Sequence, residues 1–213
     1  MMTTAVLQVD SGQPDPDTIH TAAKAIRRGA LVAFPTETVY GLAADAFNAD
    51  AVARVYEVKG RPANNPLPVQ VASEDDIVGV AVDIPEVAWE LIRRFMPGPL
   101  TIVLRASPDL PGMVTAGTGT VGVRIPDHPV ARQLLRACST PIVAPSANPS
   151  GESPPTTADE VLAYLDGRVE YILDAGATEL KIASTVVDMT CAPPRILRHG
   201  TISDEDLAPF LNR

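Results

Sequence analysis

Short apolar runs of strand type alternate with amphipathic segments of helical spacing along most of this chain. Residues 30–34 are continuously apolar and end at Pro35, which is typical of a strand covered on both faces. Residues 17–28 carry apolar side chains at helical spacing, with Asp17 placed to cap the helix and Gly29 placed to end it. This alternation favours an α/β fold in which a twisted mixed β-sheet carries helices on its faces.

The same patterns divide the rest of the chain. We expect further strands over residues 5–9, 67–71, 100–104, 121–125, 141–144, 171–173, 184–189 and 195–197. We expect further helices over residues 50–58, 73–82, 85–95, 130–138 and 157–165, and a short final helix capped by Ser203. Residues 145–155 are rich in proline, serine and glycine and are predicted to form a loop. No repeat or linker stands out, so residues 1–213 are expected to form one domain.

The composition is that of a globular protein with an acidic surface. Hydrophobic residues make up 46% of the chain and charged residues 20%, which excludes the intrinsically disordered class. The net charge of −9 argues against a surface that coats nucleic acid, although it is compatible with a local basic cleft.

The cysteines and the N-terminal segment indicate the cellular compartment of the protein. Cys138 and Cys191 fit no metal-ligand spacing and imply no disulfide framework, which is typical of reduced thiols in the cytosol. No basic region followed by an apolar run opens the chain, and no segment approaches 18 uninterrupted apolar residues. We therefore expect a cytoplasmic protein that is neither exported nor membrane-spanning.

Two cations stand one residue apart in the motif Lys59-Gly60-Arg61-Pro62. Because glycine and proline interrupt the preceding helical pattern, we expect both cations to leave an irregular, extended segment. Residues i and i+2 of an extended segment point the same way, so Lys59 and Arg61 are predicted to aim at one spot, which suits a phosphate group. From spacing alone, a solvated basic turn after a helix remains the alternative.

Two other motifs fail on their context. Residues 117–122 match G-x-G-x-x-G, but a strand ended by proline follows, where a dinucleotide site requires a helix. Ser146 lacks the G-x-S-x-G elbow of hydrolases, and no histidine is positioned by sequence to activate it. Ser146 and Asn148, a hydroxyl and an amide on a loop after a strand, suit hydrogen bonds to an anion or a sugar instead.

Four polar loops follow strands, at residues 35–41, 59–62, 145–148 and 196–200. Ligands of open α/β sheets bind where such loops meet beyond the strand ends. Arg124 lies mid-strand between apolar neighbours and is either a solvent-facing strand residue or a bidentate ligand for a carboxylate.

At these positions the sequence resembles the YrdC family, the threonylcarbamoyl-AMP synthases that make the activated intermediate for threonylcarbamoyladenosine in tRNA. The motifs that carry the resemblance stand in the family's order: Pro-Thr-Glu-Thr-Val-Tyr-Gly at 35–41, Lys-Gly-Arg-Pro-Ala-Asn-Asn-Pro-Leu at 59–67, Pro-Gly-Pro-Leu-Thr at 97–101, Val-Arg-Ile-Pro at 123–126, Pro-Ser-Ala-Asn at 145–148 and Ser-Thr-Val-Val-Asp at 184–188. The joint occurrence of Lys59, Arg61, Ser146 and Asn148 is the family's specific signature. The resemblance implies a single YrdC-like domain of the short form, without an extra C-terminal domain.

The resemblance also implies substrates and site residues. ATP, L-threonine and bicarbonate would give threonylcarbamoyl-AMP and pyrophosphate, and a tRNA-modifying transferase complex would consume the product. No protein metal site is implied, because Mg²⁺ would be carried with ATP. Lys59 and Arg61 would be catalytic. The implied ATP-binding residues are Lys59, Arg61, Asn65, Thr120, Ser146, Asn148 and Arg198. The implied threonine-binding residues are Thr36, Thr38, Gln70, Arg124, Ala144 through its backbone, and Ser184. Gln70 departs from the family's pattern, which commonly has histidine there.

Two alternatives from other classes stay open. The first is an RNA-binding module, since the fold has been associated with RNA binding, and weak RNA binding is also compatible with the enzyme. The second is a carbamoyltransferase that forms a carbamoyl adenylate, as YrdC-like modules do inside larger maturation proteins. Those modules normally come with zinc-finger and acylphosphatase segments, which these 213 residues do not contain.

Overall fold

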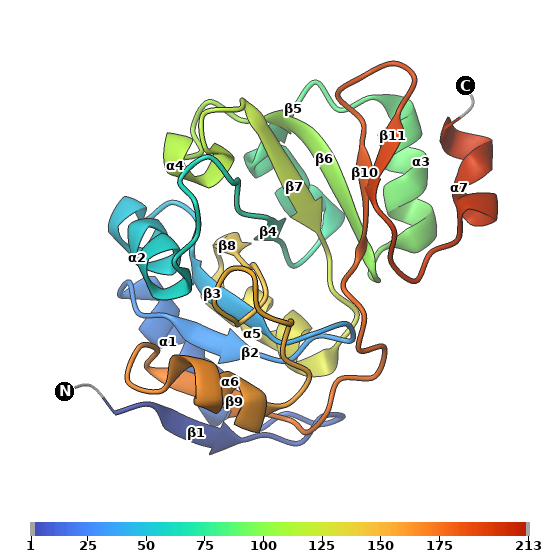
Figure 1. Cartoon of the computed structure of the whole chain (residues 1–213). Coiled ribbons are helices and arrows are strands. Elements are labelled where there is room, and N and C mark those ends of the chain that lie inside the picture. The colour runs from blue at the N-terminus through green and yellow to red at the C-terminus, as the bar shows by residue number, and fades with distance from the viewer. Residues whose placement is uncertain (1–2, 212–213) are drawn as a thin grey trace.

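The structure is a computed structural model that describes residues 3–211 (Figure 1). The strands are β1 (Ala5–Gln8), β2 (Val32–Phe34), β3 (Gly41–Asp45), β4 (Val69–Gln70), β5 (Ala81–Val82), β6 (Leu100–Ala106), β7 (Thr120–Arg124), β8 (Ile142–Val143), β9 (Tyr171–Asp174), β10 (Thr185–Asp188) and β11 (Arg195–Arg198). The helices are α1 (Pro16–Arg27), α2 (Ala49–Lys59), the 3₁₀ helix η1 (Glu74–Gly79), α3 (Glu86–Phe95), α4 (Gly112–Thr115), α5 (Pro129–Cys138), α6 (Ala158–Leu165) and α7 (Asp204–Leu211).

The strands form one mixed sheet in the order β1-β9-β2-β3-β8-β4-β7-β6-β10-β11, and β5 pairs with β6 beside this path. Strand β9 runs parallel to β1 and β2, β4 runs parallel to β7, and β6 runs parallel to β10. The remaining pairs are antiparallel. The predicted α/β fold with a mixed sheet and helices on its faces is confirmed.

The side chains of residues 31–34, at and just before β2, point alternately to the two faces of the sheet. Leu31 and Ala33 lie in one hydrophobic core, and Val32 and Phe34 lie in a second one on the opposite face. Helices α1 and α5 pack on the second core, while α2 and α6 contribute to the first, so helices cover both faces (Figure 1). This explains why the strand reads as an uninterrupted apolar run.

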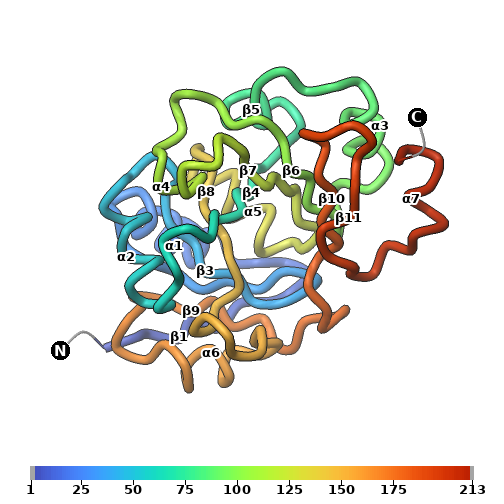
Figure 2. The backbone as a smooth tube through the Cα atoms, turned by 45° about the horizontal axis from the view of Figure 1, so that its top comes forward, coloured from blue at the N-terminus to red at the C-terminus, as the bar shows by residue number. Residues whose placement is uncertain are grey.

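The other part of the sheet has one apolar face and one polar face. Leu100, Ile102 and Leu104 of β6 are buried in the first core with residues of α3 and α7. Those two helices lie side by side next to β10 and β11 (Figure 2), and the rings of Phe95 and Phe210 meet at 5.9 Å. Thr101 and Val103, which alternate with these core residues along β6, line a cavity on the opposite face.

Three local predictions were wrong or incomplete. The helix expected over residues 73–82 is instead the short η1 followed by β5, because residues 81–82 pair with β6 in the sheet. The Asp76 carboxylate accepts hydrogen bonds from the backbone N and hydroxyl of Ser73 and caps the start of η1. Helix α1 is capped by Asp15, whose side chain accepts from the Thr18 backbone N at 2.9 Å, and not by Asp17, which lies in the first turn. Strand β3 and helix α4 were not predicted.

None of the helices that the structure describes combines the length and the apolar character needed to cross a membrane.

Candidate active site

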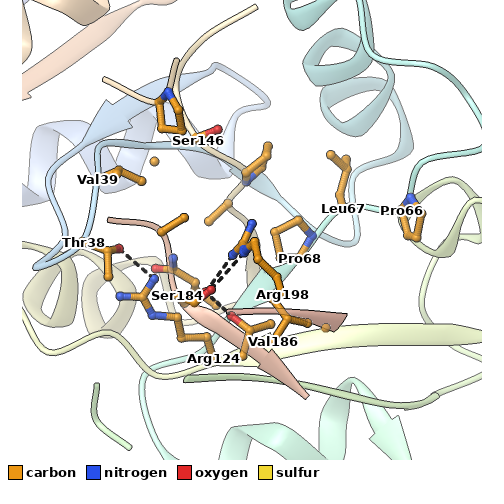
Figure 3. Close-up of a pocket in the computed structure, with 18 of the residues that line it drawn as sticks. Thr38, Val39, Pro66, Leu67, Pro68, Arg124, Ser146, Ser184, Val186 and Arg198 are labelled. Atoms are coloured by element: carbon orange, nitrogen blue, oxygen red, sulfur yellow. Dashed lines mark hydrogen bonds between the residues drawn. The ribbon is translucent and has the colours of Figure 1, made fainter. Parts of the chain in front are cut away.

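A cavity of about 380 Å³ lies on the polar face of the sheet (Figure 3). All four polar loops identified in the sequence contribute side chains to its wall. Of the thirteen predicted site residues, eleven line it: Thr36, Thr38, Arg61, Asn65, Gln70, Thr120, Arg124, Ala144, Ser146, Ser184 and Arg198. The other two, Lys59 and Asn148, are buried behind the wall.

The register of β4 and β7 explains why Gln70 and Arg124 lie together in the cavity wall. Gln70 of β4 and Arg124 of β7 are direct partners in a parallel pair, so their side chains project from the same face of the sheet next to one another. On β7 the residue two positions before Arg124 is Gly122, which leaves the floor of the cavity open. A Cβ added at Gly122 would lie 3.1 Å from the Thr101 side chain of β6.

Arg124 is buried and is fixed on three sides. Its Nε donates to the Gly98 carbonyl oxygen at 3.0 Å. Its Nη1 donates to Thr38 Oγ1 at 3.0 Å, as Figure 3 shows. Its Nη2 lies 2.7 Å from Glu37 Oε1, and both side chains of this ion pair are only 7% exposed. Arg124 is therefore not a solvent-facing strand residue, and that alternative is wrong.

The hydroxyl groups of Thr36 and Thr38 form a directed chain. Thr36 Oγ1 donates to the Val39 carbonyl oxygen at 2.6 Å, and the two threonine hydroxyls lie 2.8 Å apart. Because the single hydrogen of Thr36 is used at Val39, the Thr38 hydroxyl donates to Thr36 and accepts from Arg124. The loop is thus ordered around the guanidinium.

Ser184 and Arg198 form a second group at the cavity. Arg198 Nη2 donates to Ser184 Oγ at 3.0 Å, and Arg198 Nε donates to the Ser184 carbonyl oxygen at 2.9 Å (Figure 3). Thr101 Oγ1 lies 2.8 Å from Ser184 Oγ. Arg198 is exposed as a whole residue, but partial burial of its guanidinium, followed by the nearby positive charge of Arg124, lowers its pKa. This shift indicates a site in which added negative charge would be favourable.

Arg61 folds back on its own loop. Its Nε donates to the Asn65 carbonyl oxygen at 3.0 Å, and its Nη2 donates to Asn65 Oδ1 and the Pro66 carbonyl oxygen, each at 2.7 Å. Tyr56 Oη lies 3.0 Å from the Asn65 carbonyl oxygen and 2.8 Å from the Met113 carbonyl oxygen. Burial lowers the pKa of Arg61. Among residues 3–211, neither Arg61 nor Arg198 forms an ion pair with a carboxylate, so both remain uncompensated cations.

The expected extended segment at Lys59 is wrong. Helix α2 continues through Lys59, because Gly60 adopts the left-handed conformation with φ of 57° and ends the helix after it. Lys59 Nζ donates to the carbonyl oxygens of Ser146, at 2.5 Å, and of Asn148. Lys59 and Arg61 therefore do not aim at one spot. Burial, with a contribution from Arg61, lowers the pKa of Lys59 to about 7.

Asn148 acts on the same loop. Its side-chain Nδ2 donates to the Pro149 carbonyl oxygen at 2.9 Å and to the Glu152 carbonyl oxygen at 2.7 Å. Lys59 and Asn148 thus brace the segment that carries Ser146, which lines the cavity.

Two residues of the site were not assigned a role from the sequence. Glu37 belongs to the Pro-Thr-Glu-Thr-Val-Tyr-Gly motif at residues 35–41, and its carboxylate pairs with Arg124. Thr101 lies between the core residues Leu100 and Ile102. A polar residue within this apolar strand was the signal in the sequence that could have identified Thr101 as a site residue.

In the part of the chain that the structure describes, no group of three or more His, Cys, Asp or Glu side chains is placed to hold a metal ion.

Comparisons with known proteins place these residues in a wider context. A family model for the Sua5, YciO and YrdC proteins, described as "Telomere recombination", matches residues 24–200. Threonylcarbamoyl-AMP synthase of Pyrococcus abyssi is 48% identical over 189 residues, which cover 89% of this chain and 56% of that protein. Threonylcarbamoyl-AMP synthase of Bacillus subtilis is 47% identical over 194 residues, which cover 91% of this chain and 56% of that protein.

A crystal structure of P. abyssi Sua5 complexed with L-threonine is similar to this one, with a TM-score of 0.95 and 45% sequence identity. The match covers 98% of this chain and 61% of that chain. The chain therefore spans just over half the length of the curated relatives above.

Proposed function

The chain belongs to the family of Sua5, YciO and YrdC proteins, and from this we propose that it is an L-threonylcarbamoyladenylate synthase. The membership confirms the resemblance to the YrdC family. The proposed substrates are L-threonine, bicarbonate and ATP, and the products are threonylcarbamoyl-AMP and pyrophosphate. The names of the two relatives support this proposal, as does the similar structure that holds L-threonine.

The observation that carries the proposal is the division of charge within one cavity, by which we mean that one of its arginines is paired with a carboxylate of residues 3–211 and two are not. Arg124 is neutralised by Glu37, whereas Arg61 and Arg198 have no acidic partner among residues 3–211. A neutralised guanidinium binds a carboxylate through the geometry of its N–H groups, which suits a zwitterionic amino acid. Two uncompensated cations suit the greater negative charge of a triphosphate.

We assign the threonine subsite to the Arg124 end of the cavity. Arg124 would receive the carboxylate, and Thr36, Thr38, Gln70 and Ser184 would offer hydrogen bonds to the rest of the molecule. The backbone N of Ala144 already donates to the Pro68 carbonyl oxygen at 2.8 Å, so the Ala144 carbonyl oxygen is the atom left for the ligand.

We assign the triphosphate of ATP to the space bounded by the uncompensated cations. Arg61, Asn65, Thr120, Ser146 and Arg198 would contact it. Lys59 and Asn148 would act by holding the Ser146 segment. Mg²⁺ would arrive bound to the phosphates, since phosphate oxygens supply the ligands that this cation prefers.

The proposed chemistry requires no protein nucleophile. The threonine amine and bicarbonate form a carbamate with loss of water, and a carbamate oxygen then bonds to the α-phosphorus of ATP. The bond from that phosphorus to the β-phosphate oxygen breaks, and pyrophosphate leaves. Both reacting groups are anions, so catalysis rests on positioning and on cations that stabilise the charge of the leaving group. We expect the product to pass to a transferase complex that modifies tRNA.

Pyrophosphate release tests the proposal. The protein is incubated with ATP, Mg²⁺, bicarbonate and L-threonine, and release is measured again with each component omitted. We expect release to require all of them. Release that is indifferent to threonine would remove the proposed substrate, and release driven by carbamoyl phosphate instead would support the carbamoyltransferase alternative.

A further inference from the structure

We propose that Glu37 is a positioning residue, which holds the Arg124 guanidinium in the orientation that receives the carboxylate of the amino-acid substrate. The inference rests on the function proposed above and extends it to a residue that does not line the cavity. Glu37 would act through Arg124 and not by touching the substrate.

The burial of Glu37 is the first step. The residue is 5% exposed, and apart from the ion pair with Arg124 neither carboxylate oxygen has a hydrogen-bond partner among the described residues. Removing a carboxylate from water costs several kcal/mol unless a partner compensates it. The compensating group is the Arg124 guanidinium, 2.7 Å away. A side chain needed only to fill this space would be apolar, so the charge of Glu37 is explained by its effect on Arg124.

The geometry around Arg124 is the second step. Two segments far apart in the chain hold the guanidinium. Gly98 before β6 accepts from Nε, while in the loop at residues 35–41 Thr38 accepts from Nη1 and Glu37 faces Nη2. An arginine has five N–H groups in a rigid plane, so contacts on three nitrogens fix the direction of the remaining groups. Of these three partners of Arg124, Glu37 is the one that carries a negative charge.

The anchoring of Glu37 is the third step. Its backbone carbonyl oxygen accepts from the Leu180 backbone N at 2.8 Å, and the neighbouring Tyr40 backbone N donates to the Pro155 carbonyl oxygen at 2.9 Å. These bonds tie the loop to two segments far along the chain. Glu37 is therefore presented to Arg124 by a fixed backbone and does not depend on a mobile loop.

The test uses E37Q, E37D and the control E179Q. E37Q keeps the shape of the side chain and removes its charge, while E37D keeps the charge and withdraws it by one methylene. E179Q removes one negative charge at an exposed residue that neither lines the cavity nor pairs with Arg124. Wild type and variants are compared by the KM for threonine and the KM for ATP in the pyrophosphate assay, and by urea unfolding.

We expect E37Q to raise the KM for threonine by about ten- to hundredfold, the range of a lost hydrogen bond or ion contact to a charged group, with the KM for ATP changed by less than about twofold. E37D should give a smaller rise with the same selectivity for threonine, and E179Q should give none. A purely structural role would lower stability without separating the two KM values.

Several outcomes would overturn the inference. It fails if folded E37Q keeps the wild-type KM for threonine, or if both KM values rise together. Should E37Q not fold because Arg124 loses its partner, E37D decides by the same criterion. If wild type releases pyrophosphate without threonine, the proposed function itself has failed, which is a distinguishable result.

Discussion

At the scale of single residues, Lys59 couples the site to pH. Burial lowers its pKa to about 7 from the ordinary 10.5. Between these two values the unfolded chain holds a proton that the folded chain does not, so the free energy of unfolding rises with pH across this interval. We expect wild type to gain stability relative to Lys59→Met from about pH 7 to about pH 10, as measured by urea unfolding. Parallel pH profiles would show that Lys59 stays protonated in the fold.

Arg198 offers a test of the triphosphate subsite. It is exposed at the end of β11, so Arg198→Ala should leave the melting temperature nearly unchanged. Loss of one preorganised donor typically lowers turnover by about a hundredfold, and we expect a loss of that order in pyrophosphate release. Arg195→Ala is the matched control, because Arg195 is an exposed arginine of the same strand that does not line the cavity. Equal activity of the two variants would contradict the assignment.

At the scale of elements, the close approach of the segment after β11 to the start of β10 depends on Gly200. A Cβ at this position would lie 2.6 Å from the Ala183 carbonyl oxygen, and the Thr185 hydroxyl accepts hydrogen bonds from the backbone N of Gly200 and Ile202. We expect Gly200→Ala to cost about 1–3 kcal/mol of stability and to lower activity by displacing Arg198 from Ser184. Thermal unfolding and the pyrophosphate assay measure both effects.

The control for this variant is Gly79→Ala. Within the described chain, no heavy atom other than those of Gly79, its two neighbours and the backbone of η1 lies within 4 Å of the Cβ that this substitution would add. Gly79→Ala should therefore change neither stability nor activity by a measurable amount, and a larger effect there than at Gly200 would contradict the explanation by close backbone approach.

The elements that could be predicted from the sequence are those whose pattern is local. Strand β2 was predicted from its apolar run and its terminal proline, and α5 from its spacing. Strand β3, with the sequence Gly-Leu-Ala-Ala-Asp, was missed because small residues without β-branching give no strand signal, and its pairing with β2 and β8 decides its conformation. The end of α2 was misplaced because a left-handed glycine allows a helix to continue to the residue before it.

At the scale of the whole molecule, the convergence of the polar loops was predicted but their internal partners were not. The contact of Arg124 with Thr38 joins residues 86 positions apart, and its ion pair with Glu37 spans a similar separation. The pattern of strands and helices in the sequence does not predict these two side-chain contacts. The resemblance to a family indicated which residues form the site, and the structure adds that Lys59 faces the loop that carries Ser146 and not the cavity.

The division of charge predicts a difference in salt dependence. The whole chain carries a net charge of −9, while Arg61 and Arg198 at the cavity form no ion pair with a carboxylate of residues 3–211. Because salt screens accessible charges more than buried pairs, the KM for ATP should rise several-fold between about 0.05 and 0.5 M salt. The KM for threonine should change less, since Arg124 is buried and paired. Equal salt dependence of the two constants would contradict this division.

The most direct measurement is a crystal structure of the chain with L-threonine and a non-hydrolysable ATP analogue. We predict that both ligands occupy the one cavity, with the threonine carboxylate on Arg124 and the triphosphate between Arg61 and Arg198. Ligands bound on separate surfaces, or phosphates seated on Arg124 in place of the amino acid, would contradict the account.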